Sequence, residues 1–205
     1  MIKQNIQRLM LSTFCLLAVS TLIPSQCLAA SSSKPTPQFY AYCVELGVPG
    51  VKQRPIVEQV KLLKKLGFDA GGFLMWLDDK SIAANLHALD EGGLSLAMLE
   101  INVNIGEKGP AYDPRLPDAI RKLKGRDATI CVTMTGRKPG DPAGLAPAIK
   151  LLRELGDVAA EARCRISVYQ HVGAWSESLP FIFDVVRQVN HPQVGANFNL
   201  CHYLK

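Results

Sequence analysis

The feature that most constrains the fold is a regular alternation, after residue 38, of short β-type runs with amphipathic helical stretches. Candidate strands begin near Phe39, Phe68, Leu94, Ala128, Arg165 and Val194. Five segments between them repeat apolar residues at helical spacing, as Ile56, Val60 and Leu63 do. The strand starts are about 30 residues apart, the size of a strand-helix-strand crossover, and such crossovers join parallel strands. The sequence therefore predicts an α/β protein whose parallel sheet is covered by helices.

Two parallel architectures fit this alternation, an open doubly wound sheet and a closed eight-stranded barrel. A dinucleotide-binding open sheet carries G-x-G-x-x-G after its first strand, whereas this chain has Gly47-Val48-Pro49-Gly50 there. The barrel is therefore favoured. We expect an incomplete (β/α)8 TIM barrel with six parallel strands and about five helices, and its chemistry at the C-terminal ends of the strands.

Polar residues share one parity along the expected strands, while the opposite parity is largely apolar, as in Ile130 and Val132. The inward set is Ala41, Cys43 and Glu45; Met98, Glu100 and Asn102; Cys131, Thr133 and Thr135; Ser167, Tyr169 and His171; Asn197 and Asn199. Alternate residues of a barrel strand face the interior. The pattern predicts a polar barrel mouth suited to a small hydroxylated molecule.

Residues 1–29 are typical of an export signal. Lys3 and Arg8 precede an apolar run from Leu9 to Ile23, and Cys27-Leu28-Ala29 offers a small-residue exit. A retained anchor needs about 20 apolar residues, so cleavage is favoured over retention. We expect residues 30–38 to be a linker, residues 39–205 to be the partial barrel domain, and the protein to be periplasmic or extracellular without a stable membrane span.

The charge balance names no partner. The formal net charge of +5 falls to +3 without the signal, too small to indicate nucleic-acid binding. Four cysteines follow the signal: Cys43, Cys131, Cys164 and Cys201. Export permits disulfides, but these cysteines are scattered and lie in or beside apolar runs, so we expect buried free thiols.

Several segments together resemble a known family. They are Gly93–Met98, Tyr112-Asp113-Pro114, Ala119–Gly125, Val168–Gly173 and, most specifically, Val194–Leu204. The chain resembles the xylose isomerase-like TIM-barrel proteins of the sugar phosphate isomerase/epimerase superfamily, and above all their exported bacterial members. The resemblance spans nearly all of the chain after the signal.

The resemblance implies a divalent metal (Mn, Mg, Co or Zn) at the barrel mouth and proton transfer beside the carbonyl of a sugar. It aligns Asn199 with a metal-binding Asp, His202 with a substrate-contacting His, and Tyr169 roughly with a metal-binding Glu. Neutral Asn offers a cation only a carbonyl dipole, and a phenol with a pKa near 10 is a poor ligand for a hard metal. We therefore expect a degenerate metal site.

Parity places two acids, Glu45 and Glu100, at inward strand ends. A carboxylate there suits a general base or a metal ligand, and the alternative is a hydrogen-bonded mouth residue. We assign Glu100 and His202 as catalytic candidates and Asn199 and Glu45 as metal-site candidates. The substrate-binding candidates are His171, Tyr169, Trp76 and Trp175, although tryptophans at such positions more often pack between loops.

The 176 residues after the signal hold six strand units, whereas such barrels typically have about 250 residues. We expect a C-terminally truncated chain that is inactive by itself, or else one that pairs with itself or a partner. The leading function is a sugar isomerase or epimerase that uses metal-assisted proton transfer when complete. The alternative is a non-catalytic, exported carbohydrate-binding protein; an abasic-site nuclease is disfavoured because no basic groove is evident.

Overall fold

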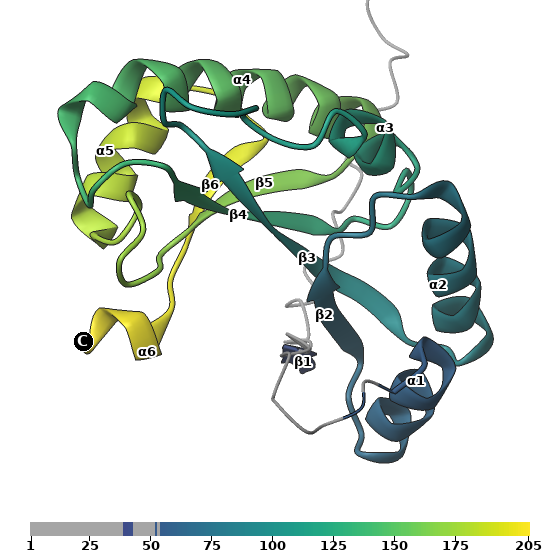
Figure 1. Ribbon diagram of the computed structural model, residues 1–205. Helices are drawn as coiled ribbons and strands as arrows, with labels where there is room; N and C mark the ends of the chain where they lie inside the picture. The colour runs from purple at the N-terminus through teal and green to yellow at the C-terminus, as the bar shows by residue number, and fades with distance from the viewer. Residues whose placement is uncertain (1–38, 43–51, 53) are drawn as a thin grey trace, which may run out of the picture. The chain divides into compact units, whose positions relative to one another are not determined.

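The computed structural model describes residues 39–42, 52 and 54–205 (Figure 1). The expected signal, the whole expected linker, Cys43 and Glu45 lie outside these residues. Within them, six strands form one parallel sheet in the order β1-β2-β3-β4-β5-β6. The predicted α/β class and the six parallel strands are confirmed.

The strands are β1 (Tyr40–Tyr42), β2 (Ala70–Leu74), β3 (Ser95–Asn104), β4 (Thr129–Thr135), β5 (Arg165–Tyr169) and β6 (Val194–Asn197). The helices are α1 (Ile56–Lys65), α2 (Asp79–Glu91), α3 (Leu116–Arg121), α4 (Leu145–Ala162), α5 (Leu179–Val189) and α6 (Leu200–Tyr203), and a 3-10 turn covers Pro142–Gly144. The expected strand starts and the five expected helices agree with these bounds. The short helix α6 was not predicted, and it contains His202, which had been expected in a loop.

Left-handed glycines make two of the turns between a helix and the next strand. Gly67 follows the C-cap of α1 with φ of +85°, and Gly125, with φ of +86°, lies between α3 and β4. No other residue type adopts this conformation as readily. The helices α4 and α5 instead end at left-handed Arg163 and Asn190.

The main core lies between the helices and the outward face of the sheet. Leu152 and Leu155 of α4 are fully buried in one cluster with Ile130 of β4 and Ile166 of β5. Burying a Leu or Ile side chain stabilises a fold by about 1.5–3 kcal/mol relative to leaving it exposed. Because α4 is the longest helix and buries eight of its residues, it is a principal support for the central strands.

The inward face has its own small cluster, formed by Met98, Cys131 and Tyr169. The predicted parity is thus confirmed in β3, β4 and β5. It is wrong in β1, where Ala41 packs against the helix-facing core while Tyr40 and Tyr42 line a pocket on the inner face. A strand of three residues gives too short a pattern to fix its register, and a shift by one residue exchanges the two faces.

The cysteine expectation is met at two of the three described positions. Cys131 and Cys164 are buried free thiols, whereas Cys201 is free but exposed, contrary to expectation. The physical reason is that α6 has no buried residue, so the apolar character around Cys201 does not place it in a core. Over the described residues, no helix combines the length and the apolar character needed to cross a membrane.

Candidate functional site

The candidate site lies on the inner face of the sheet and begins with Glu100 of β3. The hydroxyl of Tyr42, at the end of β1, donates a hydrogen bond to Glu100 Oε2. Glu100 pairs in register with Leu74, the last residue of β2, although β3 itself continues for four further residues to Asn104. Glu100 therefore faces the interior as predicted, but it lies within β3 rather than at its end.

The electrostatic surroundings of Glu100 favour its protonated form. Burial raises the pKa of this carboxyl, while the charge of His171 and the nearby Thr133 hydroxyl act in the opposite direction. The side chain is only half-buried, so its carboxylate is still accessible to a ligand. A carboxylate whose proton affinity is raised in this way is a stronger base than a fully solvated one, which suits it to accept and return a proton.

Tyr169, the last residue of β5, forms a hydrogen bond with Asn199, which lies two residues after the end of β6. Asn199 Nδ2 donates a hydrogen bond to the hydroxyl oxygen of Tyr169, and Asn199 Oδ1 accepts one from the backbone N–H of His202 at 3.2 Å. The second bond caps the N-terminus of α6. Burial raises the pKa of the Tyr169 phenol, so this side chain is uncharged at neutral pH.

Two imidazoles lie beside this pair. The ring centroids of His171 and His202 are 4.2 Å apart, and they lie 6.2 Å and 6.0 Å from the ring centroid of Tyr169. His202 Nδ1 accepts the backbone N–H of Val172 at 3.4 Å, which leaves the proton of the neutral ring on Nε2. Burial and the charge of His171 lower the pKa of His202, so its neutral form is favoured.

Five of the predicted site residues are therefore brought together: Glu100, Tyr169, His171, Asn199 and His202. Tyr42 belongs to the same cluster, because its ring centroid is 6.4 Å from that of Tyr169 and its hydroxyl binds Glu100. The sequence analysis missed Tyr42. The alternation in Tyr40-Ala41-Tyr42 would have indicated Tyr42 if the two tyrosines, and not Ala41, had been taken as the inward-facing residues.

A cavity of about 250 Å³ opens beside the Tyr169–Asn199 pair. It is lined by Tyr40, Tyr42, Met98, Tyr169, Asn197, Phe198, Asn199 and Leu200. Aromatic faces next to a few amide and hydroxyl groups suit a molecule with both apolar C–H surfaces and hydroxyl groups. We call this cavity the mouth pocket.

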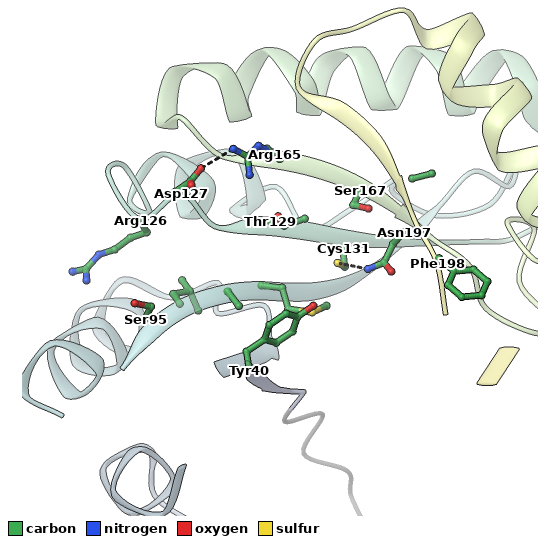
Figure 2. A pocket seen from close by; sticks show the side chains of 14 residues that line it. Tyr40, Ser95, Arg126, Asp127, Thr129, Cys131, Arg165, Ser167, Asn197 and Phe198 are labelled. Atoms are coloured by element: carbon green, nitrogen blue, oxygen red, sulfur yellow. Dashed lines mark hydrogen bonds and ion pairs between the residues drawn. The ribbon is translucent and has the colours of Figure 1, made fainter. Parts of the chain in front are cut away.

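A larger cavity, of about 460 Å³, lies toward the N-terminal ends of the strands (Figure 2). Thr129 and Arg165, which begin β4 and β5, line it, and Arg165 forms a 3.2 Å ion pair with Asp127. Neither cavity has Glu100, His171 or His202 in its lining, but two residues of the mouth pocket bind them directly, Tyr42 to Glu100 and Asn199 to His202. Since the chemistry of such barrels is found at the C-terminal ends of the strands, the mouth pocket is the better candidate for an active site.

The structure contradicts the assignment of Trp175 to sugar binding. Trp175 is fully buried, its indole N–H donates to the carbonyl oxygen of Asp141 at 2.7 Å, and its ring meets Phe181 edge-on at 4.8 Å. A ligand has no access to this ring. Trp76 is partly buried against the helix-facing core and lies 5.6 Å from Phe73. Both tryptophans thus follow the packing alternative.

The described residues do not fit a divalent cation. No group of three His, Cys, Asp or Glu side chains that could hold a metal occurs in residues 39–42, 52 and 54–205. The amide of Asn199 is used at both ends, by Tyr169 and by the cap of α6. Tyr169 remains a neutral phenol, a poor ligand for hard metals. The other metal-site candidate, Glu45, lies outside the described residues.

A parallel sheet with helices on its outer face and a polar, aromatic inner mouth defines a protein of the TIM-barrel class. No sequence-family model matches the chain, and no curated protein does. Solved structures do match. A 3-keto-D-glucoside 4-epimerase from E. coli shares 16% identity over 78% of this chain and 67% of its own, with a TM-score of 0.61.

Two further matches belong to the same structural group. A xylose isomerase-like TIM barrel protein from Mycobacterium smegmatis, in complex with magnesium, shares 19% identity over 81% of this chain and 66% of its own, with a TM-score of 0.56. A D-allulose 3-epimerase from Methylomonas sp., in complex with D-allulose, shares 16% identity over 77% of this chain and 62% of its own, with a TM-score of 0.56.

The chain thus spans about two thirds of the length of these structures, or slightly less. The described residues have the xylose isomerase-like TIM-barrel fold, with six parallel strands of an incomplete barrel. At identities below 20%, the likeness establishes this fold and leaves the chemistry to be argued from the site.

Proposed function

We propose that this protein binds a carbohydrate in the mouth pocket and moves a proton at a carbon next to its carbonyl group, as a sugar isomerase or epimerase does. The observation that carries the proposal is the position of Glu100. Its carboxyl faces the interior, its proton affinity is raised by burial, and it is close enough to Tyr42 and His171 to interact with both. The similarity of the fold to that of two sugar epimerases supports the choice of reaction class.

In this proposal Glu100 is the general base. The carboxylate removes the proton from the carbon beside the carbonyl. Return of this proton to the former carbonyl carbon gives isomerisation, and protonation of the same carbon from the opposite face by a water molecule gives epimerisation. Neutral His202 donates from Nε2 to a sugar hydroxyl, since its Nδ1 is engaged by Val172. The aromatic rings of Tyr40 and Tyr42 provide stacking surfaces at the pocket wall.

Metal assistance is not part of the proposal. The resemblance implies a divalent cation, but the described site offers one carboxylate, Glu100, and two imidazoles that do not form a group of three metal-binding side chains with it. Its phenol and amide already bind each other. Without a set of anionic ligands, binding in this pocket would not compensate a hard cation for the loss of its hydration shell. The proton transfer is therefore assigned to the side chains of this chain and to water.

The test is solvent-proton exchange with D-allulose as the probe. The chain is incubated with D-allulose in D₂O, and loss of the proton signal at the carbon next to the carbonyl is followed by NMR. We expect catalysed exchange by the wild type, in contrast to the inactivity that the sequence predicts for an incomplete barrel. Glu100→Gln should decrease the rate at least about 100-fold, the lower range for removing a general base. Glu58→Gln, on the exposed face of α1, is the matched control and should exchange at the wild-type rate.

A second candidate function is non-catalytic carbohydrate binding by an exported protein. The observation that favours it is the neutral Tyr169–Asn199 pair, at positions where the resemblance implies two metal-binding carboxylates. Saturation-transfer NMR on the same samples separates the two functions. Binding of D-allulose without exchange supports the binding protein, and exchange that depends on Glu100 supports the enzyme. If the sugar neither binds nor exchanges, both proposals are wrong.

A further inference from the structure

We propose that Tyr169, held by Asn199, donates its hydroxyl hydrogen to an oxygen of the ligand in the mouth pocket, and that the pair thereby replaces a divalent cation as the electrophilic group of the site. The nature of the ligand rests on the proposed function. The independence from metal does not, because it follows from how the two side chains are bonded.

Both ends of the Asn199 amide already take part in hydrogen bonds within the protein. Its Nδ2 donates to the Tyr169 hydroxyl, and its Oδ1 accepts the backbone N–H of His202 at 3.2 Å. A cation bound at Oδ1 would compete with this N–H and weaken the cap of α6. The amide is thus committed to orienting Tyr169 and fixing the start of the helix.

The hydroxyl hydrogen of Tyr169 is free to be donated to a ligand. A phenol has one O–H donor and can also accept. Because the Tyr169 oxygen accepts from Asn199, its own hydrogen is directed to another acceptor, and the hydroxyl borders the mouth pocket. A hydroxyl that accepts one hydrogen bond becomes a stronger donor in the next. The pair therefore aims a polarised donor toward the space a ligand would occupy.

The Tyr169 hydroxyl and the Glu100 carboxyl lie on the same inner face of the sheet. The Tyr42 side chain connects the two, since its hydroxyl binds Glu100 and its ring centroid is 6.4 Å from that of Tyr169. A base and a hydrogen-bond donor on the same inner face are the two groups that proton abstraction next to a carbonyl requires. Tyr42 is in this view a positioning residue that holds the carboxylate at a set distance from the donor.

The reaction balances without any co-reactant other than water. Glu100 takes the proton, the electron pair of the C–H bond forms a carbon–carbon double bond, and the carbonyl electron pair moves to its oxygen. The Tyr169 hydroxyl stabilises the negative charge that develops on that oxygen. For isomerisation, Glu100 gives its proton to the former carbonyl carbon, and the hydroxyl hydrogen on the carbon that lost the proton passes to the former carbonyl oxygen, so that a new carbonyl forms without an external oxidant or reductant. For epimerisation, a water molecule protonates the same carbon from the opposite face, and Glu100 releases its proton to the solvent.

The first experiment is a Mn²⁺ titration of the metal-free chain without sugar, followed by electron paramagnetic resonance. We expect no stoichiometric Mn²⁺ binding by the wild type. The double variant Tyr169→Glu, Asn199→Asp, which puts two carboxylates at the same places, should bind Mn²⁺ at least about tenfold more tightly than the wild type. Stoichiometric binding of Mn²⁺ by the wild type would overturn the proposal, as would a double variant that folds but binds no better.

The second experiment measures D-allulose exchange with and without EDTA. We expect no effect of EDTA, and a decrease of about 100-fold in Tyr169→Phe, the range for loss of one preorganised oxyanion donor. Tyr203→Phe, an exposed tyrosine of α6, is the matched control and should behave as the wild type. Exchange that EDTA abolishes, or that Tyr169→Phe leaves unchanged, contradicts the proposal.

The two proposals fail separately. If the wild type shows no exchange, the proposed enzymatic function is wrong, and the Mn²⁺ titration still decides whether the site is independent of metal. If exchange occurs but requires a cation, the proposed function stands and the role given to Tyr169 and Asn199 is wrong.

Discussion

Replacement of Trp175 tests whether this ring is a structural anchor or a ligand contact. Trp175→Ala removes a fully buried ring, together with its edge-on contact with Phe181 at 4.8 Å and its hydrogen bond to Asp141. Large aromatic truncations in a core cost about 3–5 kcal/mol of unfolding free energy. We expect Trp175→Ala to fall in that range, a large fraction of the total stability of an ordinary domain.

Trp175→Phe separates the hydrogen bond from the packing. The carbonyl oxygen of Asp141 also accepts the backbone N–H of Gly144 at 3.0 Å, so it keeps a partner when the indole N–H is lost. The loss is then the net value of one hydrogen bond, about 1 kcal/mol, plus a small cavity term. We expect Trp175→Phe to cost about 1–2 kcal/mol.

The assay is urea unfolding followed by far-UV circular dichroism, because the substitutions remove a fluorescent reporter. Trp76→Ala is the comparison, and its cost should be smaller because Trp76 is only partly buried. The reasoning is refuted if Trp175→Ala unfolds within about 1 kcal/mol of the wild type. It is also refuted if Trp175→Ala keeps full stability and loses D-allulose binding, since that is the behaviour of a ligand contact.

Two further predictions concern the pH dependence of stability and the glycines. Burial raises the pKa of Glu100 in the folded chain, so the stability that its protonated form contributes is present at acidic pH and is lost as the pH rises through the folded pKa. In urea unfolding, Glu100→Gln should therefore gain stability relative to the wild type between about pH 4 and pH 7. A difference in stability that stays constant or shrinks over this range would contradict the prediction. At Gly136, with φ of +87°, an added Cβ would lie 1.9 Å from Asn104 Oδ1 and 2.7 Å from the backbone nitrogen of Gly106, whereas at Gly125, with φ of +86°, nothing lies within 4 Å. Gly125→Ala should therefore cost only the left-handed conformation, about 1–2 kcal/mol, and Gly136→Ala a further ~1–3 kcal/mol; equal costs in thermal unfolding would show that the close approach is unimportant.

The architecture could be predicted from the sequence because the alternation along strands and the helical spacing of apolar residues recur in unit after unit. Every expected strand after β1 is flanked by helices whose apolar spacing is unambiguous, and the parity of β3 to β5 follows from several alternating positions. The strand β1 has only three residues, Tyr40–Tyr42, and a tyrosine suits either face of a sheet. Its register is set by contacts with Glu100 and the inner pocket, which are distant in sequence.

The inward direction of site residues could be predicted from alternation along a single strand. Contacts between segments distant in sequence could not. Tyr169 and His171 share the parity of β5, and Asn199 continues that of β6, so their common face could be predicted. That Asn199 would bond to Tyr169 and cap α6 depends on distances between segments that no spacing reveals. Trp175 was mispredicted for a similar reason, since its burial depends on Asp141 and Phe181.

The strand order of the sheet has a consequence for synthesis of the chain. Each strand from β2 to β6 pairs with the strand made immediately before it (Figure 1). A strand leaving the ribosome therefore meets a neighbour that is already assembled, and no early strand has to wait for a distant late one. Growth of this sheet can proceed from the N-terminal side one unit at a time, with the exposed hydrogen-bonding edge moving along the sheet as translation advances.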